Sequence, residues 1–160
     1  MPKELEIFID GASKGNPGPS GIGVIICHNG EVIRNISNFI GNATNNIAEY
    51  TALIYALEEA LLLKAENIKI NTDSQLLARQ LNKIYKIKNP HIFTLYQQVL
   101  RMLDSFKKVD ICEIPRQQNK GADKLATQAI KKFFDKKAGR RQSLPGCTPE
   151  RGKSGLQRKA

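Results

Sequence analysis

The chain has 160 residues, of which 41% are hydrophobic and 25% charged, which is the size and composition of one folded domain that needs neither disulfides nor a structural metal. It has no apolar run of about 20 residues, no signal-peptide pattern over Met1–Asp10 and only three scattered cysteines, so the sequence argues against a membrane span, a disulfide framework and a zinc site, and a cytoplasmic setting is expected. Of the net charge of +10, residues 131–160 carry +8, from 10 Lys and Arg against 2 Asp and Glu, which suggests a polyanionic partner for that part of the chain.

The first 40 residues are predicted to form three strands in an antiparallel meander. Glu4–Asp10, Gly23–Cys27 and Glu31–Ile40 are the apolar or alternating segments that are typical of strands. Asn29-Gly30, between the second and the third, is a strong hairpin turn. The segment Gly11–Gly21 is rich in glycine and proline, which predicts a long, turn-rich connection.

After residue 44 the hydrophobic period changes to that of a helix. A helix is predicted over residues 45–63, with Thr44 or Asn45 as its N-cap. The further elements expected in chain order are a strand over Asn67–Thr72, a helix from Asp73-Ser74 to Leu81, a helix over Ile92–Phe106, a strand over Val109–Ile114, a polar loop over Pro115–Lys120 and a helix from about Ala122. This order predicts one mixed α/β sheet with helices packed on its faces.

The apolar pattern of the last helix stops near Lys137, and Gly, Pro, Ser, Arg and Lys dominate beyond it. We therefore predict a domain over residues 1–137 and a basic, disordered tail over residues 138–160. Two roles for this tail stay open: it strengthens nucleic-acid binding by counterion release, or it is dispensable or foreign to the natural chain.

Four acids occur where the predicted elements can bring them together. Asp10 and Asp73 directly follow strands, Glu49 lies at the edge of an apolar helical stripe, and Asp123 is in the first turn of the last helix. Taken singly, Asp10 suits a turn, Asp73 an N-cap and Asp123 a helix dipole. If the first and fourth strands pair in parallel, Asp10 and Asp73 become neighbours, and helices can bring the other two acids over them.

Close carboxylates repel one another and shift each other's pKa values, and divalent cations relieve that repulsion. Oxygen ligands suit Mg²⁺ or Mn²⁺, and a pair of such ions suits in-line hydrolysis of a phosphodiester.

Other chemistries fit less well. The glycine-rich segment at residues 15–21 lacks the Lys-Ser/Thr end of a phosphate loop and leads into a strand. His28 and His91 are expected at the surface, and Cys27 and Cys112, which fall in strands, are expected in the core. The absence of Trp and the few aromatic residues argue against a base-stacking platform.

Four short motifs occur in order: IDGASKGNPG at residues 9–18, TNNIAE at 44–49, NTDSQ at 71–75 and NKGADKLA at 119–126. Together they resemble the type 1 ribonuclease H family, over a match from about Glu4 to Phe134. The resemblance implies a ribonuclease H-like α/β fold, with a five-stranded mixed sheet of order 3-2-1-4-5 and helices on both faces. It also implies endonucleolytic hydrolysis of the RNA strand of RNA–DNA hybrids with two Mg²⁺ or Mn²⁺ ions, leaving 5′-phosphate and 3′-hydroxyl ends. The metal ligands and catalytic residues that it assigns are Asp10, Glu49, Asp73 and Asp123.

The resemblance further implies which residues contact the hybrid. Those expected at the minor groove are the backbone of Gly11, Ala12 and Ser13 and the side chains of Asn16, Asn45, Asn46 and Gln75. Thr44 is expected to hold a DNA phosphate, and Arg116 and Asn119 are expected to contact substrate. Amide groups suit a shallow groove that displays 2′-hydroxyls, although each of these Asn residues suits a helix cap or turn equally well.

Two departures from the family pattern bear on activity. Many bacterial members carry a loop histidine before the last acid, whereas Pro115–Asn119 contains none. Arg116 can hold a phosphate but cannot act as a base, so slower or more metal-dependent turnover is expected. The basic protrusion of many bacterial members is reduced to Lys83–Lys88, which indicates the compact branch of the family.

The main alternative is a module of the same fold that binds hybrids or double-stranded RNA without hydrolysis. The complete set of four acids favours the enzyme, since a binding module has no need of mutually repelling carboxylates. A fragment of a larger retroelement or fused enzyme is a third hypothesis, which the initial Met and the self-sufficient core disfavour. We expect a cytoplasmic monomer with an RNA–DNA hybrid as its partner and no membrane association.

Overall fold

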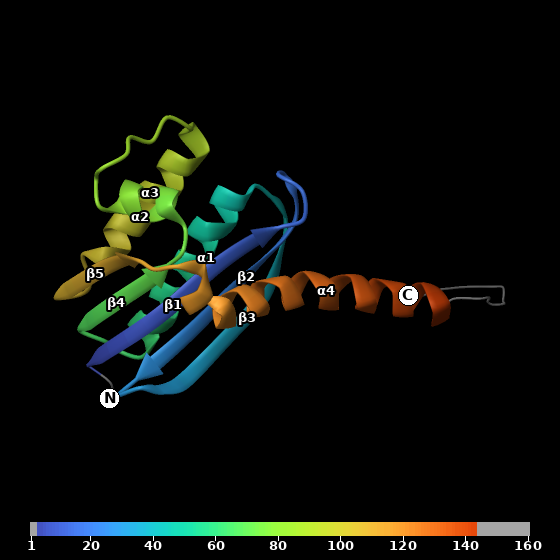
Figure 1. The fold of residues 1–160 in the computed structure, drawn as a ribbon, viewed down its shortest axis with the longest axis horizontal. Helices are drawn as coiled ribbons and strands as arrows, with labels where there is room; N and C mark the ends of the chain where they lie inside the picture. Colours follow the sequence, from blue (N-terminus) through green and yellow to red (C-terminus); the bar gives the residue numbers. More distant parts are fainter. Residues whose placement is uncertain (1–2, 144–160) are drawn as a thin grey trace.

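The structure, a computed structural model, describes residues 3–143 and contains one five-stranded sheet of order β3-β2-β1-β4-β5 (Figure 1). The elements are β1 (Glu4–Ser13), β2 (Gly18–His28), β3 (Glu31–Ala43), α1 (Asn45–Leu62), β4 (Asn67–Thr72), α2 (Gln75–Leu81), α3 (Pro90–Leu103), β5 (Lys108–Glu113), a 3₁₀ turn (Arg116–Gln118) and α4 (Lys120–Ser143). Strand β1 is antiparallel to β2 and parallel to β4, while β2–β3 is antiparallel and β4–β5 is parallel. The predicted mixed sheet and its strand order are confirmed.

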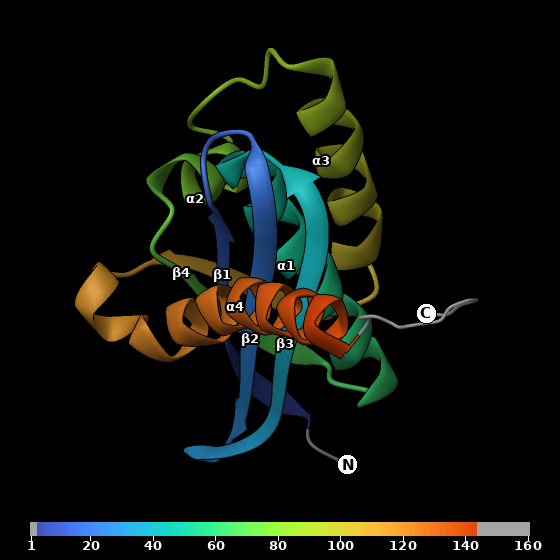
Figure 2. The ribbon, with the colours of Figure 1, turned by 90° about the vertical axis from the view of Figure 1, so that its right-hand side faces the viewer.

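Helices cover both faces of this sheet. Helix α1 packs against β1 and β2 on one face, and α3 packs against α1. Helix α4 crosses β2 and β3 on the other face (Figure 2). Within the described residues, no helix is both long enough and apolar enough to cross a membrane.

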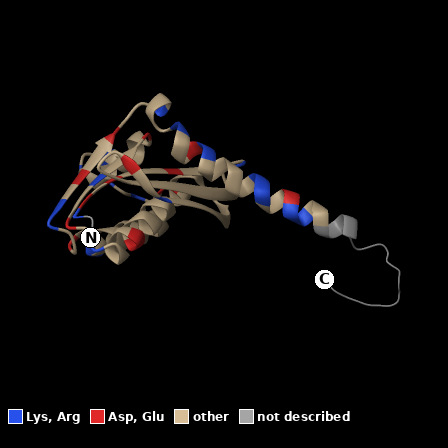
Figure 3. Cartoon of the chain, turned by 90° about the horizontal axis from the view of Figure 1, so that it is seen from below, with Lys and Arg blue, Asp and Glu red and all other residues tan. Residues whose placement is uncertain are grey.

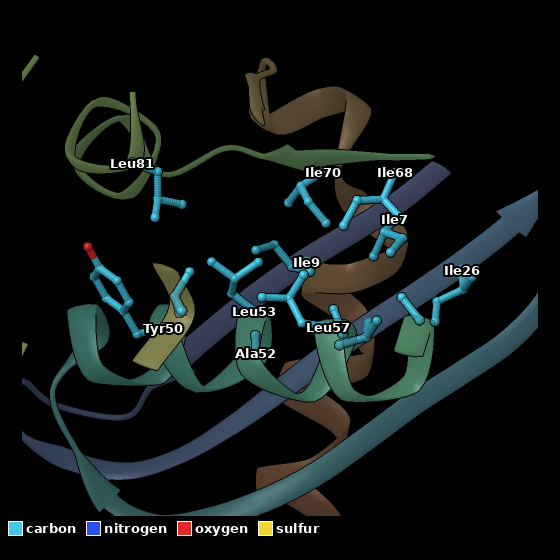
Figure 4. Close-up of a cluster of buried hydrophobic side chains, with 14 of the residues drawn as sticks. Ile7, Ile9, Ile26, Tyr50, Ala52, Leu53, Leu57, Ile68, Ile70 and Leu81 are labelled. Atoms are coloured by element: carbon cyan, nitrogen blue, oxygen red, sulfur yellow. The ribbon is translucent and has the colours of Figure 1, made fainter. Parts of the chain in front are cut away.

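The core lies between α1 and the sheet. Ile7 and Ile9 of β1 and Ile70 of β4 are fully buried and meet Leu53 and Leu57 of α1 (Figure 4). Because side chains alternate along a strand and recur every three to four residues along a helix, these residues form two matching apolar surfaces. The core therefore holds β1, β4 and α1 in fixed relative positions.

The prediction of a long, turn-rich connection over Gly11–Gly21 is wrong. Strand β1 continues to Ser13 and β2 begins at Gly18, so only four residues separate the strands. The glycines of this segment serve close packing instead. A Cβ on Gly11 would lie 2.5 Å from the backbone nitrogen of Glu49, and one on Gly21 would collide with the backbone of α4. Glycine thus lets both helices approach the sheet.

The first two helices, α1 and α2, are capped at their N-termini by side-chain hydroxyl groups. The Thr44 hydroxyl accepts the N–H of Ile47 at 3.2 Å, and the Ser74 hydroxyl accepts the N–H of Leu77 at 3.1 Å. These are N-caps, so Thr44 rather than Asn45 caps α1. Helix α2 begins at Gln75, directly after the predicted start at Asp73-Ser74. Because Ser74 is the cap, the Asp73 carboxylate is not used as one.

Helix α4 is longer than the apolar pattern indicated. It runs from Lys120 to Ser143, so residues 138–143 of the predicted disordered tail are helical, which corrects the predicted start of that tail. Lysine, alanine and arginine are good helix formers and extend the helix without an apolar stripe. The rest of the predicted tail, residues 144–160, lies outside the described residues.

The two strand cysteines are not core residues as predicted. Cys27 and Cys112 are both half-buried, because each lies on the side of its strand that faces away from α1. His91 is exposed as expected, and His28 is half-buried, with its ring nitrogen 3.1 Å from the carbonyl oxygen of Glu4.

Candidate active site

Three acids that are far apart in the sequence meet beside the sheet. Asp10, Glu49 and Asp73 each place a carboxylate oxygen within 4.8 Å of the oxygens of the other two. Ile9 of β1 pairs with Thr72 of β4 in parallel register. The residues that follow them, Asp10 and Asp73, therefore lie side by side. Glu49 comes from the first part of α1, which packs on β1.

Asp123, in the first turn of α4, is outside this group of three but faces Asp10. The negative charge of its carboxylate is near enough to Asp10 to contribute, after burial, Glu49 and Asp73, to the raised pKa of that residue. The structure therefore brings all four predicted acids to one place, three of them within the distance of a shared ion.

The backbone of β1 fixes Glu49. Its Oε1 accepts the N–H of Gly11 at 2.7 Å, and the Glu49 side chain is buried. Burial raises the pKa of Glu49 above its ordinary value, while the Gly11 hydrogen bond opposes the rise. The Gly11 N–H, which was expected to contact the minor groove, is thus used within the protein.

Burial and like charge act together on Asp10. Its pKa is raised well above the ordinary value, first by burial and then by the negative charges of Glu49 and Asp73. Without a cation, the cluster retains protons because burial disfavours several adjacent negative charges. A dense set of carboxylate oxygens, two of them on the buried residues Asp10 and Glu49, is the donor set that Mg²⁺ and Mn²⁺ prefer, so these residues fit a divalent metal centre.

Asn119, which was expected to contact substrate, is buried beside the acids. It is only 1% exposed, and its Nδ2 donates to the Ile9 carbonyl at 2.9 Å and to the Asp73 carboxylate at 3.1 Å. It lies immediately before α4. Asn119 therefore links β1, Asp73 and the start of α4, and we assign it as a positioning residue rather than a surface contact for substrate.

We expect Asn119→Ala to lower kcat by about 10- to 100-fold, because a displacement of about 1 Å in a reacting group costs that much. The value of KM should stay near that of the wild type, since the side chain does not reach the surface. Steady-state kinetics on a labelled hybrid separate the two quantities, with the exposed Gln117→Ala as control. A raised KM with an unchanged kcat would restore the substrate-contact hypothesis.

The other predicted substrate residues, which we call the rim residues, lie on β1, in the β1–β2 turn, at the starts of α1 and α2 and in the 3₁₀ turn before α4. Asn16 accepts the Asn45 N–H at 3.0 Å through its Oδ1, so the β1–β2 turn contacts the beginning of α1 beside Thr44. The Ser13 hydroxyl donates to the Ala43 carbonyl at 2.9 Å. The remaining members differ in exposure: Ala12 and Asn46 are half-buried, and Gln75 and Arg116 are exposed.

The Asn46 side chain has a feature that the sequence does not reveal. Its Oδ1 is buried and has no hydrogen-bond partner among the described residues. A buried amide oxygen without a partner is costly, and a hydrogen-bond donor on a bound molecule would satisfy it. The contact predicted for Asn46 is consistent with this observation.

The sheet order and the carboxylate cluster define a ribonuclease H-like protein. A family model described as reverse transcriptase-like matches residues 8–129. A ribonuclease H of Wigglesworthia glossinidia brevipalpis is 42% identical over 111 residues, which cover 69% of either chain. The chain therefore belongs to the ribonuclease H family.

Two further proteins are similar to this chain over about four fifths of its length. The bifunctional protein Rv2228c of Mycobacterium tuberculosis is 37% identical over 129 residues, or 79% of this chain, and the match spans only 35% of that longer protein. The crystal structure of LC11-RNase H1, from compost, in complex with an RNA/DNA hybrid has a TM-score of 0.77 and 35% identity, covering 81% of this chain and 99% of that one.

Proposed function

We propose that this protein hydrolyses the RNA strand of RNA–DNA hybrids endonucleolytically, leaving 5′-phosphate and 3′-hydroxyl ends. The observation that carries the proposal is the convergence of Asp10, Glu49 and Asp73 within 4.8 Å, with Asp123 facing Asp10. The relative bound to an RNA/DNA hybrid supports the choice of substrate.

The four acids would hold two Mg²⁺ or Mn²⁺ ions. When bound, such ions supply Lewis-acid stabilisation of charge at the attacked phosphate and an activated water. The protein contributes rigidity, because Asp10 lies in a central strand and Asp73 directly follows the neighbouring one. It also contributes burial, which keeps bulk water away from Asp10 and Glu49.

The rim residues would position the hybrid. The Asn45 and Ile47 N–H groups are already bonded to Asn16 and Thr44, so Thr44 and the Asn46 N–H at the positive end of α1 would hold a phosphate of the DNA strand. Asn46, Gln75 and the β1 backbone of Ala12 and Ser13 would face the minor groove, and Arg116 would hold a further phosphate. The proposed readout uses shape and 2′-hydroxyl groups rather than base sequence.

We further infer the context of the activity. The proposed site lies within residues 1–137, which we treat as the catalytic domain, and the basic segment 138–160 follows it. The proposed setting is a monomer in the cytoplasm. All four acids of the proposed metal site, Asp10, Glu49, Asp73 and Asp123, belong to this domain.

The test is incubation of the full chain with an RNA–DNA hybrid labelled at the 3′ end of the RNA, with Mg²⁺ or Mn²⁺. Internal cuts in the RNA strand are expected, with 5′-phosphate on the downstream fragments. A DNA duplex of the same sequence and the hybrid in EDTA should stay intact. Tight binding of the hybrid without cleavage in either metal would replace the enzyme by the binding module, and absence of both would refute the proposal.

A further inference from the structure

The outer half of α4 extends away from the sheet. After crossing β2 and β3 the helix continues to Ser143, well past the edge strand β3 (Figure 1). All residues from 131 to 139 are exposed. Lys and Arg occur along this projecting part (Figure 3), with four lysines against one aspartate over residues 131–139. A helix that buries so little of its outer half gains little from packing there.

One side of this helix continues from the proposed active site. Phe134 follows Asp123 by eleven residues, which is about three turns, so the two side chains lie on the same side of α4. Lys137 is fourteen residues from Asp123 and lies about 40° from that line. The side of α4 that carries an acid of the cluster at its beginning therefore carries Phe134 and Lys137 farther out.

The β1–β2 turn independently shows which way this side faces. The Lys14 ammonium is 6.0 Å from the centre of the Phe134 ring. Phe133 holds that ring edge-on at 5.5 Å and itself stacks on Phe39 of β3 with ring centres 3.9 Å apart. The Phe134 ring is thereby fixed in place, although it is 39% exposed.

The same turn carries the proposed phosphate contact. Asn16, two residues after Lys14, accepts the N–H of Asn45 beside Thr44. The β1–β2 turn thus contacts the beginning of α1 through Asn16 and Phe134 through Lys14, and Lys137 follows Phe134 by three residues, about one turn farther along α4. Two ammonium groups with an exposed aromatic ring between them match the alternating phosphates and sugars of a nucleic-acid backbone.

We propose that Lys14, Phe134 and Lys137 form a second binding surface for the DNA strand of a hybrid, beyond the Thr44 corner. This rests on the proposed function, which sets the substrate and the phosphate at Thr44. The lysines neutralise phosphates, and the ring packs against a sugar between them. Asp123 and Lys137 are about 21 Å apart along the helix, or about six phosphate steps of one strand. The Lys137 end of this surface therefore contributes to affinity only for hybrids that extend about six phosphate steps beyond the active site.

The experiment measures hybrid affinity of the full chain against salt concentration in EDTA, where the substrate is not cut. The test variant is Lys14→Ala/Lys137→Ala. The matched control is Lys132→Ala, because Lys132 is nine residues from Asp123 and lies on the opposite side of the same exposed helix. We expect the test variant to bind a 20-base-pair hybrid about 3- to 10-fold more weakly and to lower the salt slope by about 1–2.

Hybrid length gives a second readout. With a hybrid too short to reach Lys137, the single variant Lys137→Ala should have the affinity of the wild type, and Lys132→Ala should match wild type on both lengths. A wild-type salt slope in the test variant, or an equal loss with Lys132→Ala, would overturn the surface. If the wild type fails to cut any hybrid while the slope difference persists, the proposed hydrolysis is wrong and the binding surface stands.

Discussion

Asp10→Asn should slow hybrid cleavage by about 10³-fold or more and, at the same time, stabilise the metal-free protein. The amide has nearly the shape of the carboxylate but cannot carry its charge, so the cluster loses a central ligand for the proposed ions. An effect of that size is typical when a residue acts only in the transition state. The two consequences have one cause, the crowding of negative charge at Asp10.

The stability effect has a definite sign. Because the folded-state pKa of Asp10 is raised, the folded protein retains a proton that the unfolded chain loses near pH 4. The free energy of unfolding of the metal-free wild type must therefore fall as pH rises above about 4, until the raised pKa is passed. Asp10→Asn removes this loss and should be more stable at pH 7 by about 1–3 kcal/mol.

Urea unfolding in EDTA at pH 5 and pH 8 measures this difference. Asp135→Asn is a suitable control, since Asp135 is an exposed acid on α4 outside the cluster. The gap between wild type and Asp10→Asn should widen from pH 5 to pH 8, and the control should follow wild type. A gap that is constant with pH would show that Asp10 is ionised in the metal-free protein and that the carboxylates do not repel as strongly as inferred.

Gly11→Ala should cost both stability and activity. The new Cβ would lie 2.5 Å from the backbone nitrogen of Glu49, so α1 has to move away from β1. We expect a loss of about 2–4 kcal/mol in the free energy of unfolding, as for other forced overpacking in a rigid core. The movement also breaks the hydrogen bond from Gly11 to Glu49, and cleavage should slow by about 100-fold or more.

The control is Gly139→Ala, a glycine on the exposed part of α4 with nothing near its Cβ position. This substitution should leave cleavage unchanged and stabilise the protein by about 0.5–1 kcal/mol, because alanine favours a helix. Unfolding in urea and initial cleavage rates suffice for both variants. Unchanged kinetics in a folded Gly11→Ala protein would mean that Glu49 does not depend on β1 for its position.

Hydrophobic periodicity accounts for much of what the sequence predicted. The alternating positions of β1 locate its part of the core. The helical stripe predicted from Ile47 to Leu61 is only partly right, because Tyr50 and Leu57 are buried while Leu61 is exposed. Once β1 and β4 pair in parallel, the residues that follow the two strands meet, so the closeness of Asp10 and Asp73 follows from the local strand pattern together with the strand order. The four motifs supply the family and strand order, which a single chain's periodicity does not determine.

The errors have a common origin in contacts between distant residues. The glycines at 11 and 21 look like turn formers, yet they are needed where helices approach the strands. Asn119 bonds to Ile9, 110 residues away, and no local pattern marks such a partner. The length of α4 was underestimated because its outer half continues by helix propensity rather than by an apolar stripe.

The four acids come from four separate elements, β1, α1, the end of β4 and the start of α4. No contiguous fragment shorter than residues 10–123 contains the whole set. A nascent chain on the ribosome therefore passes through most of its synthesis without a complete metal centre. Under the proposed function, cutting is acquired late and all at once, when α4 docks on the finished sheet, and partial products of translation are inert toward hybrids.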